Sequence, residues 1–246
     1  MPWITPRVPS PYILILKMTS RIRRKLPTSL LLKFPFIYRL PFVKYESLLQ
    51  ESKGLEDLLT KLNSVLNLSG DIIECGSAYC GTAVIIAKYL KLKGISKRVY
   101  ALDFFGSGFD LEELEEERRL GLTEINDDAF TVGYSYEYVK KKIDILAVSD
   151  TVIPVRGHFR DTLPQLKTEF CLSLIDCDLK NSIVYCAEMI WPRLSKNGIM
   201  LFDDYKTYHI FRGPKIAIDE FVGRHKNEIL EHGMLNRLYY IVKKNK

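Results

Sequence analysis

The sequence lacks long apolar runs and paired cysteines. No stretch approaches the roughly 18 apolar residues of a membrane-spanning helix, and the apolar stretch nearest the start, Tyr12–Leu16, is short even for a signal peptide. Secretion is therefore disfavoured, and we expect a cytoplasmic protein. The five cysteines are an odd number without C-x-x-C spacing, as expected of reduced, buried thiols. This pattern argues against a disulfide framework and against a structural zinc site.

Acidic residues are absent from the first 44 residues. This segment holds nine Lys or Arg and seven of the eleven prolines, whereas the rest of the chain has a net charge of −3. The prolines argue against a long regular helix in it. We therefore distinguish a basic, proline-rich extension, residues 1–45, from a domain over residues 46–246.

Two interpretations of this extension stay open. Its basic residues, within 7–44, could dock onto an anionic membrane or carrier, which would make the protein peripherally membrane-associated. Alternatively, the extension packs on the domain or on a second subunit of a homo-oligomer. Nucleic acid binding fits less well, because nothing in the domain continues the basic surface.

From about residue 45, short apolar runs alternate with amphipathic segments of helical length. This alternation is typical of βα units around a mostly parallel sheet with flanking helices. Strands are predicted near 71–75, 98–103, 152–156, 171–176, 198–203 and 236–242, and helices near 46–66, 81–93, 136–147, 181–194 and 214–229. An insertion at 107–135 contains an acidic run that predicts a helix, which is either a solvated face or a lid over the site.

Four of the predicted strands have an acidic residue at or next to their carboxyl end. In open α/β sheets the ligand lies outside the carboxyl ends of the strands, so these side chains are expected at one edge. Buried carboxylates are costly unless they are paired or bind a ligand. Their convergence indicates a cationic ligand, a polyol or a metal; the four are Glu74, Asp103, Asp176 and Asp203.

The first strand leads into a glycine-containing loop, Glu74-Cys-Gly-Ser-Ala-Tyr-Cys-Gly-Thr82. Gly76 and Gly81 permit tight turning and close approach of a ligand. Ala78 stands where a dinucleotide site needs its middle glycine, which argues against a pyrophosphate. An acid before the first glycine suits an amino or sulfonium group, and Asp103 is placed to accept both ribose hydroxyls. S-adenosylmethionine (SAM) combines these three groups.

Paired acids follow two neighbouring strands. Asp176, Asp203 and Asp204 can supply an all-oxygen ligand set for a hard divalent ion, most naturally Mg²⁺. Asp178 could then remain off the metal as a general base. The alternative interpretation is that these acids only cap helices, which βα loops favour in any case.

These residues resemble the macrocin O-methyltransferase family of SAM-dependent enzymes, which methylate sugar hydroxyls. The resemblance spans roughly residues 70–224 in the family's order and spacing. Its segments are Gly70-Asp-Ile-Ile-Glu-Cys-Gly76, Asp103-Phe-Phe-Gly106, Gly157-His-Phe-Arg-Asp-Thr-Leu-Pro164, Asp176-Cys-Asp-Leu-Lys-Asn-Ser182, Trp191-Pro-Arg-Leu-Ser-Lys-Asn-Gly198, Phe202-Asp-Asp-Tyr205 and Ala217-Ile-Asp-Glu-Phe221. Three residues depart from the family pattern: His158, Lys180 and Asn197.

The resemblance implies a Rossmann-like class I methyltransferase fold with a mostly parallel seven-stranded sheet. It implies Asp176, Asp203 and Asp204 as magnesium ligands and Asp178 as the base that deprotonates a sugar hydroxyl. The residues assigned to the SAM site are Glu74, Gly76, Ser77, Gly81, Thr82, Asp103, Gly157 and His158.

Other functions stay open beside a sugar O-methyltransferase. A catechol-like acceptor would use the same chemistry on a different small molecule. A nicotinamide-dependent oxidoreductase is opposed by the missing middle glycine, and a non-catalytic nucleoside-binding scaffold is opposed by the intact acidic residues. The sequence supports the methyl donor better than the acceptor.

Overall fold

The computed structural model describes residues 47, 49, 53–106, 109–124, 135–206 and 212–245. The basic extension, 1–45, lies outside the described residues, as do 107–108 and 125–134 of the predicted insertion. Within the described parts, no helix combines the length and apolarity needed to cross a membrane.

The core of the domain is one seven-stranded sheet in the order β3-β2-β1-β4-β5-β7-β6. Strands β1 to β5 pair in parallel, and β7 runs antiparallel to both β5 and β6. The carboxyl ends of the five parallel strands therefore meet at one edge. The strands are β1 (Asp71–Cys75), β2 (Val99–Asp103), β3 (Val152–Arg156), β4 (Phe170–Ile175), β5 (Leu194–Phe202), β6 (Ile229–Met234) and β7 (Tyr239–Lys243).

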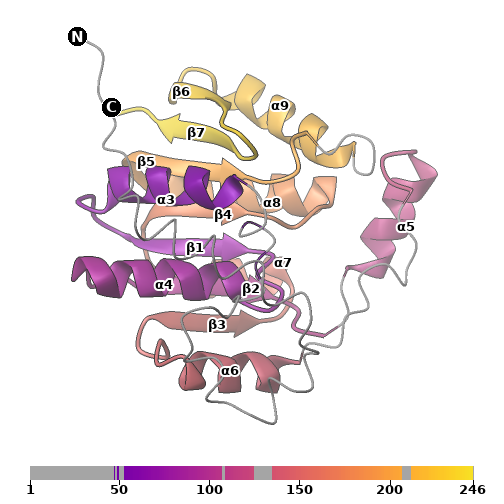
Figure 1. Ribbon diagram of the computed structural model, residues 1–246. Helices are drawn as coiled ribbons and strands as arrows, with labels where there is room; N and C mark the ends of the chain where they lie inside the picture. Colours follow the sequence, from indigo (N-terminus) through magenta and orange to yellow (C-terminus); the bar gives the residue numbers. More distant parts are fainter. Residues whose placement is uncertain are drawn as a thin grey trace.

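Helices cover both faces of the sheet (Figure 1). They are α3 (Gly54–Val65), α4 (Gly81–Lys93), α5 (Leu111–Arg119), α6 (Tyr136–Ile145), α7 (Phe159–Thr162), α8 (Lys180–Ile190) and α9 (Gly213–His225). Sequence explains two of the helix ends. Gly94 adopts the left-handed conformation and closes α4 by donating its N–H to Leu90 O and Lys91 O. Helix α8 gives way to a short 3₁₀ helix, Trp191–Arg193, that contains Pro192.

Successive side chains of a strand point to opposite faces of the sheet, so the strands contribute to two hydrophobic cores. One core joins Ile72 and Leu174 to apolar side chains of α3, α4 and α6. The other joins Ile73 and Phe202 to those of α8 and α9. Both faces of the central strands are thus buried, which explains why the sequence of these strands is a nearly continuous apolar run.

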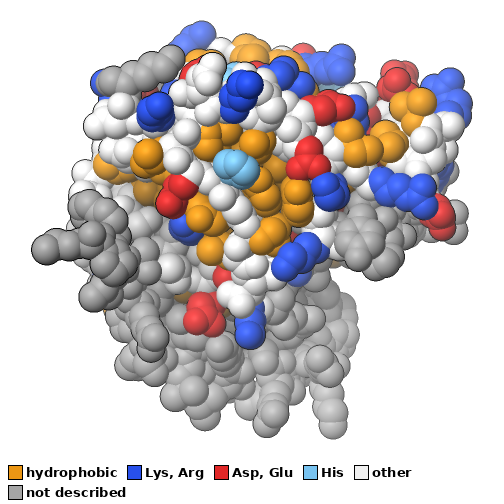
Figure 2. Space-filling model, turned by 90° about the horizontal axis from the view of Figure 1, so that it is seen from above, with side chains coloured by type: hydrophobic (Ala, Val, Ile, Leu, Met, Phe, Trp, Pro, Cys, Tyr) orange, Lys and Arg blue, Asp and Glu red, His pale blue; other side chains and the backbone are white. Residues whose placement is uncertain are grey.

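Strand β6 has no counterpart among the strands predicted from the apolar runs. Predicted helix 214–229 ends at His225, and β6 follows at the edge of the sheet. Its side chains are exposed or only partly buried, and Leu230 is 57% exposed, so β6 lacks the apolar pattern of a buried strand. Viewed from above, hydrophobic side chains gather in the middle of this face, with charged side chains around them (Figure 2).

Candidate active site

The loop after β1 turns sharply at the carboxyl edge of the sheet. Gly76 has a φ of +87°, and the residues Ala78 and Cys80 also have positive φ, at 43° and 53°. A Cβ on Gly76 would lie 1.8 Å from the carbonyl oxygen of Asp176. Gly76 is therefore required by the close approach of the β1 and β4 ends, whether or not a ligand is bound.

Glu74 lies under this loop and is 2% exposed. Its Oε2 atom has no hydrogen-bond partner among the described residues. Burial raises the pKa of Glu74 to about 8, against the opposing effect of hydrogen bonds from Ser77 and Thr82. A buried carboxyl group of this kind is suited to receive a cationic or hydrogen-bond-donating ligand group.

Asp103, at the end of β2, holds the loop in place from the neighbouring strand. Its Oδ2 accepts a hydrogen bond from the Ala78 N–H at 2.8 Å, and its Oδ1 accepts one from the Phe105 N–H at 2.9 Å. Its backbone carbonyl accepts the Gly157 N–H at 3.1 Å, which brings the end of β3 to the same place. The structure thus brings the loop, Asp103 and Gly157 together.

Sequence reasoning missed the role of Lys142. This residue of α6 is 1% exposed, and its Nζ donates a hydrogen bond to the Tyr79 carbonyl oxygen at 2.7 Å. Lys142 therefore holds the loop at Tyr79, next to the residue that Asp103 holds. A lysine in an amphipathic helix normally points to solvent, so only its place on the buried face of the helix, one residue before Ile143, could have indicated this role.

The remaining residues assigned to the SAM site lie at the same edge. Ser77 and Thr82 are buried, and the Thr82 hydroxyl lies 2.7 Å from that of Ser47. Gly81 begins α4. His158 is more exposed: its side chain is 42% accessible, its Nε2 lies 3.3 Å from Asp110 Oδ2, and its ring packs edge-on against Phe104.

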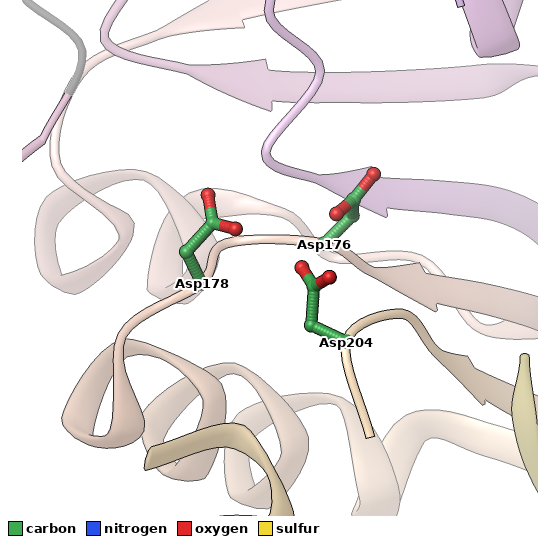
Figure 3. Close-up of side chains that lie close together, drawn as sticks. All are labelled: Asp176, Asp178 and Asp204. Atoms are coloured by element: carbon green, nitrogen blue, oxygen red, sulfur yellow. The ribbon is translucent and has the colours of Figure 1, made fainter. Parts of the chain in front are cut away.

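Three carboxylates meet beyond the ends of β4 and β5 (Figure 3). One oxygen from each of Asp176, Asp178 and Asp204 lies within 4.8 Å of the others. Burial, and then the neighbouring negative charges, raise the pKa of Asp176 and of Asp178 well above their usual range. Asp178 and Asp204 also adopt positive φ, at 59° and 60°, a conformation that aspartate tolerates better than most residues.

The structure groups the acids differently from the predicted ligand set. Asp203 is absent from the cluster and instead faces Arg237, whose Nε donates to Asp203 Oδ1 at 2.7 Å. Asp178, predicted to stay off the metal, contributes an oxygen to the cluster. Asp203 directly follows β5, whereas Asp204 has the positive φ of a turn, so the two neighbouring side chains take different directions.

The acidic helix α5 is attached to the domain by its glutamates. Glu113 accepts hydrogen bonds from the Ser182 N–H and hydroxyl, both at 2.7 Å, and Glu117 accepts the Lys180 N–H. These carboxylates therefore cap the amino end of α8. Lys180 itself forms an ion pair with Glu220 of α9 at 2.9 Å. Helix α5 lies beyond the carboxyl edge of the sheet (Figure 1).

A polar cavity of about 540 Å³ lies between α5 and the residues that follow β3. Its lining comes from α5, its N-cap Asp110, and residues near α7 and α8. It carries both signs of charge, with Glu113 and Glu116 beside Arg119 and Arg160. This cavity lies at the same end of the molecule as two groups of acids, which are Glu74 with Asp103 and the cluster of Asp176, Asp178 and Asp204.

Glu117 predicts a change in how stability depends on pH. Burial raises the pKa of Glu117 to about 7 from an ordinary value of 4.5. The folded protein therefore binds a proton at Glu117 more tightly than the unfolded chain does. The contribution of this group to the free energy of unfolding is complete below about pH 4.5 and is lost as the pH rises through about 7. In Glu117→Gln the amide oxygen still accepts the Lys180 N–H, so the variant should gain stability relative to the native protein between pH 5 and 8.

Urea unfolding across this pH range measures the difference. Glu115→Gln, at an exposed position on the same helix, is the matched control for removing one negative charge from α5, and its free energy of unfolding should differ little from that of the native protein. A constant difference between Glu117→Gln and the native protein would contradict the assignment.

Comparisons with known proteins agree with this architecture. The chain is similar to the O-methyltransferase NovP, with a TM-score of 0.68 and 22% identity over 78% of this chain and 80% of that one. It is also similar to the calicheamicin methyltransferase CalS11, with a TM-score of 0.62 and 21% identity over 94% of this chain and 90% of that one. These likenesses confirm the predicted class I methyltransferase fold.

Two sequence comparisons define the family. The chain is 27% identical over 176 residues to 8-demethyl-8-(2,3-dimethoxy-alpha-L-rhamnosyl)-tetracenomycin-C 4'-O-methyltransferase of Streptomyces olivaceus. That match covers 65% of this chain and 66% of the relative, so the chain spans just under two thirds of the relative's length. The macrocin-O-methyltransferase (TylF) family matches residues 50–234. Because this match extends over most of the chain and includes both groups of acids, the protein belongs to the macrocin-O-methyltransferase family.

Proposed function

We propose that this protein transfers the methyl group of SAM to a hydroxyl of a sugar or glycosylated small molecule. The observation that carries the proposal is the convergence at one edge of the sheet of two groups: the loop between β1 and α4 with Glu74 and Asp103, and the cluster of Asp176, Asp178 and Asp204. The first suits the donor, and the second suits the activation of an acceptor hydroxyl. Membership in a family of O-methyltransferases supports this assignment, and the rhamnosyl compound in the relative's name supports a sugar acceptor.

The donor site is proposed from the residues around the β1 loop. The unpartnered Oε2 of Glu74 could accept a hydrogen bond from a group of SAM. Glu74 would then become ionised beside the positive charge of SAM. Both oxygens of Asp103 accept backbone N–H groups, and a carboxylate oxygen can accept more than one hydrogen bond, so we propose that Asp103 binds the ribose hydroxyls. Gly157 and His158 would border the adenine from the end of β3.

The carboxylate cluster fits a divalent ion. Three oxygens from neighbouring strand ends are the ligand type that Mg²⁺ prefers, and a cation would relieve the repulsion among them. We propose Asp176, Asp178 and Asp204 as the residues that would hold it. Such an ion would act as a Lewis acid toward acceptor hydroxyls and fix their orientation.

Asp178 is proposed as the general base. It offers one oxygen to the cluster and has a second oxygen to accept the proton of the acceptor hydroxyl. The acceptor oxygen then forms a bond to the methyl carbon as the carbon–sulfur bond breaks, which converts SAM to S-adenosylhomocysteine. The rest of the site contributes by aligning the two reactants.

Calorimetric titration with SAM and, separately, with NAD⁺, each with and without Mg²⁺, tests the proposal. Binding of SAM alone supports it and leads to a screen of glycosides and catechols for methyl transfer. Binding of NAD⁺ alone would replace it with an oxidoreductase, and binding of neither would favour a non-catalytic scaffold.

Lys142 yields a prediction about the donor site. Lys142→Met keeps the length of the side chain but loses the charge-assisted hydrogen bond to the Tyr79 carbonyl oxygen. The loop is then less firmly held, so the Kd for SAM should rise about tenfold, the effect of losing about 1.4 kcal/mol of preorganisation. The same titration measures it, and the exposed neighbour Lys141 supplies the control, Lys141→Met. Equal affinities in the two variants would contradict the role of Lys142.

A further inference from the structure

Helix α8 begins two residues after Asp178 and has no side-chain cap from its own sequence. Its N-cap residue, Leu179, is apolar, and its first turn contains no acidic residue. The first N–H groups of a helix have no partner inside that helix, so they need acceptors from elsewhere in the protein. Here they belong to the segment that leads from Asp178 into α8 (Figure 3).

Helix α5 supplies these acceptors from one of its faces. Glu117 accepts the Lys180 N–H, and Glu113 accepts the N–H and the hydroxyl of Ser182, both at 2.7 Å. Positions four apart on a helix lie on the same face, so the two carboxylates reach α8 together. The amino end of a helix also attracts negative charge through its dipole. The acidic run of α5 therefore completes the first turn of a helix that is distant in the sequence.

Glu117 is held in place by packing on the other side of this contact. It is 1% exposed, and a Cβ on Gly213, the first residue of α9, would lie 2.8 Å from its Oε2 atom. On the same helix Leu114 is fully buried. Beyond the helix, the Leu122 carbonyl oxygen accepts the Arg212 N–H at 2.7 Å. Contacts with α9 and its approach thus fix where Glu117 meets α8.

The loop that carries Asp178 is fixed at both of its ends. At one end the Asp176 N–H donates to the Cys75 carbonyl oxygen at 2.8 Å, which ties the loop to β1. At the other end Glu117 holds the Lys180 N–H. Asp178 lies between these two points with a φ of +59°. Because a single residue separates Asp178 from Lys180, a displacement of Lys180 would move Asp178 with it.

We propose that Glu117 is a positioning residue for methyl transfer, which holds Asp178 at the acceptor hydroxyl by accepting the Lys180 N–H. The proposal rests on the role of Asp178 as general base in the proposed function. It gives the acidic helix α5 a part in turnover. General-base catalysis depends on the distance between the base and the hydroxyl, and a misplacement of about 1 Å costs on the order of 10²-fold in rate.

Turnover of two Glu117 variants separates the reach of this side chain from its charge. Glu117→Asp keeps the charge but is one methylene shorter, so the Lys180 N–H loses its acceptor and kcat should fall on the order of 10-fold to 100-fold. Glu117→Gln loses the charge but keeps an oxygen at the same reach, so it should restore kcat to within about threefold of the native value. Glu115→Asp, at an exposed position of the same helix, is the matched control and should turn over like the native protein.

The assay uses methyl α-L-rhamnopyranoside, or the glycoside that the screen of the proposed function identifies, at saturating SAM and Mg²⁺. Calorimetric titration of Glu117→Asp with SAM should give the native Kd and stoichiometry, because the residues proposed to hold the donor follow β1, β2 and β3. Loss of folded protein would instead lower the stoichiometry and kcat in the same proportion. Amide hydrogen exchange of the peptide that contains Lys180 should be faster in Glu117→Asp and near native in Glu117→Gln.

Gly213→Ala tests the same contact without altering Glu117, and it remains informative if Glu117→Asp does not fold. The added Cβ would meet Glu117 Oε2 at 2.8 Å and displace the end of that side chain. Exchange at Lys180 should therefore become faster and kcat should fall together. In the double variant G213A/E117D the loss should be no greater than in Glu117→Asp alone, as expected of two changes that act through one contact.

Native kcat in folded Glu117→Asp would overturn the proposal, and so would faster exchange in Gly213→Ala with native kcat or no change in exchange at all. Equal losses of kcat in Glu117→Asp and Glu117→Gln would show that the charge of Glu117 matters and its reach does not.

Failure of the proposed function gives a different pattern. If Asp178→Asn turns over like the native protein, the base on which the proposal rests is wrong, and the role of Glu117 falls with it. If Asp178→Asn is inactive while Glu117→Asp is fully active, only the role of Glu117 is wrong and the proposed function stands.

Discussion

Asp178→Asn should lower kcat for methyl transfer by about 10² to 10⁴-fold, the range typical for loss of a general base. The amide cannot accept the proton of the acceptor hydroxyl, and a neutral alcohol is a poor nucleophile. The affinity for SAM should stay near the native value, because the residues proposed to hold the donor follow β1, β2 and β3. Turnover is measured at saturating Mg²⁺, since the variant also removes one oxygen from the cluster.

A matched variant separates this effect from a general loss of charge. Asp144 is exposed on α6, so Asp144→Asn changes the net charge equally without touching the cluster. Its turnover should equal that of the native protein. Native turnover in Asp178→Asn would remove Asp178 from the mechanism, and loss of SAM binding in that variant would indicate a structural role instead.

Gly76→Ala should destabilise the protein by about 4 kcal/mol, combining the cost of overpacking with that of a positive φ. The added Cβ would lie 1.8 Å from the Asp176 carbonyl oxygen, and Gly76 and Asp176 directly follow Cys75 and Ile175, which are paired in the sheet. The ends of β1 and β4 would have to separate, which would also displace Asp176. Because whole domains are stable by only about 5–15 kcal/mol, this is a large effect. Urea unfolding of the variant measures it.

Gly94 provides the control for this substitution. It also has a positive φ, +66°, but a Cβ there would meet nothing within 4 Å. Gly94→Ala should therefore cost only about 1–2 kcal/mol, the cost of the left-handed conformation for a residue with a side chain. Similar losses in the two variants would show that the contact with Asp176 contributes nothing.

The fold and the location of the site follow from local features of the sequence. Apolar runs separated by helical segments predict parallel strands, and β1, β2 and β3 fall at or within one residue of their predicted ranges. Because parallel strands end at one edge, Glu74, Asp103 and Asp176 could be placed together before their contacts were known. Strand β6 was missed because an exposed edge strand does not need the apolar alternation by which strands are recognised.

Which charges pair was decided by tertiary structure alone. Asp203 and Asp204 are the same residue type in adjacent positions, yet one meets Arg237 and the other meets Asp176 and Asp178. The partner of Asp203 lies 34 residues away, and the turn that carries it is fixed by Asp57, 180 residues from Arg237. Likewise, Lys142 reaches Tyr79 only because α6 packs beside the β1 loop.

Sequence periodicity therefore determined the strands, their common edge and the kind of side chain gathered there. It reports which face of an element is buried, and it holds no information on what that face will contact. Contacts between distant segments form only when the sheet closes and the helices pack on it. The division of the acids into an ion pair and an open cluster is a property of that packing.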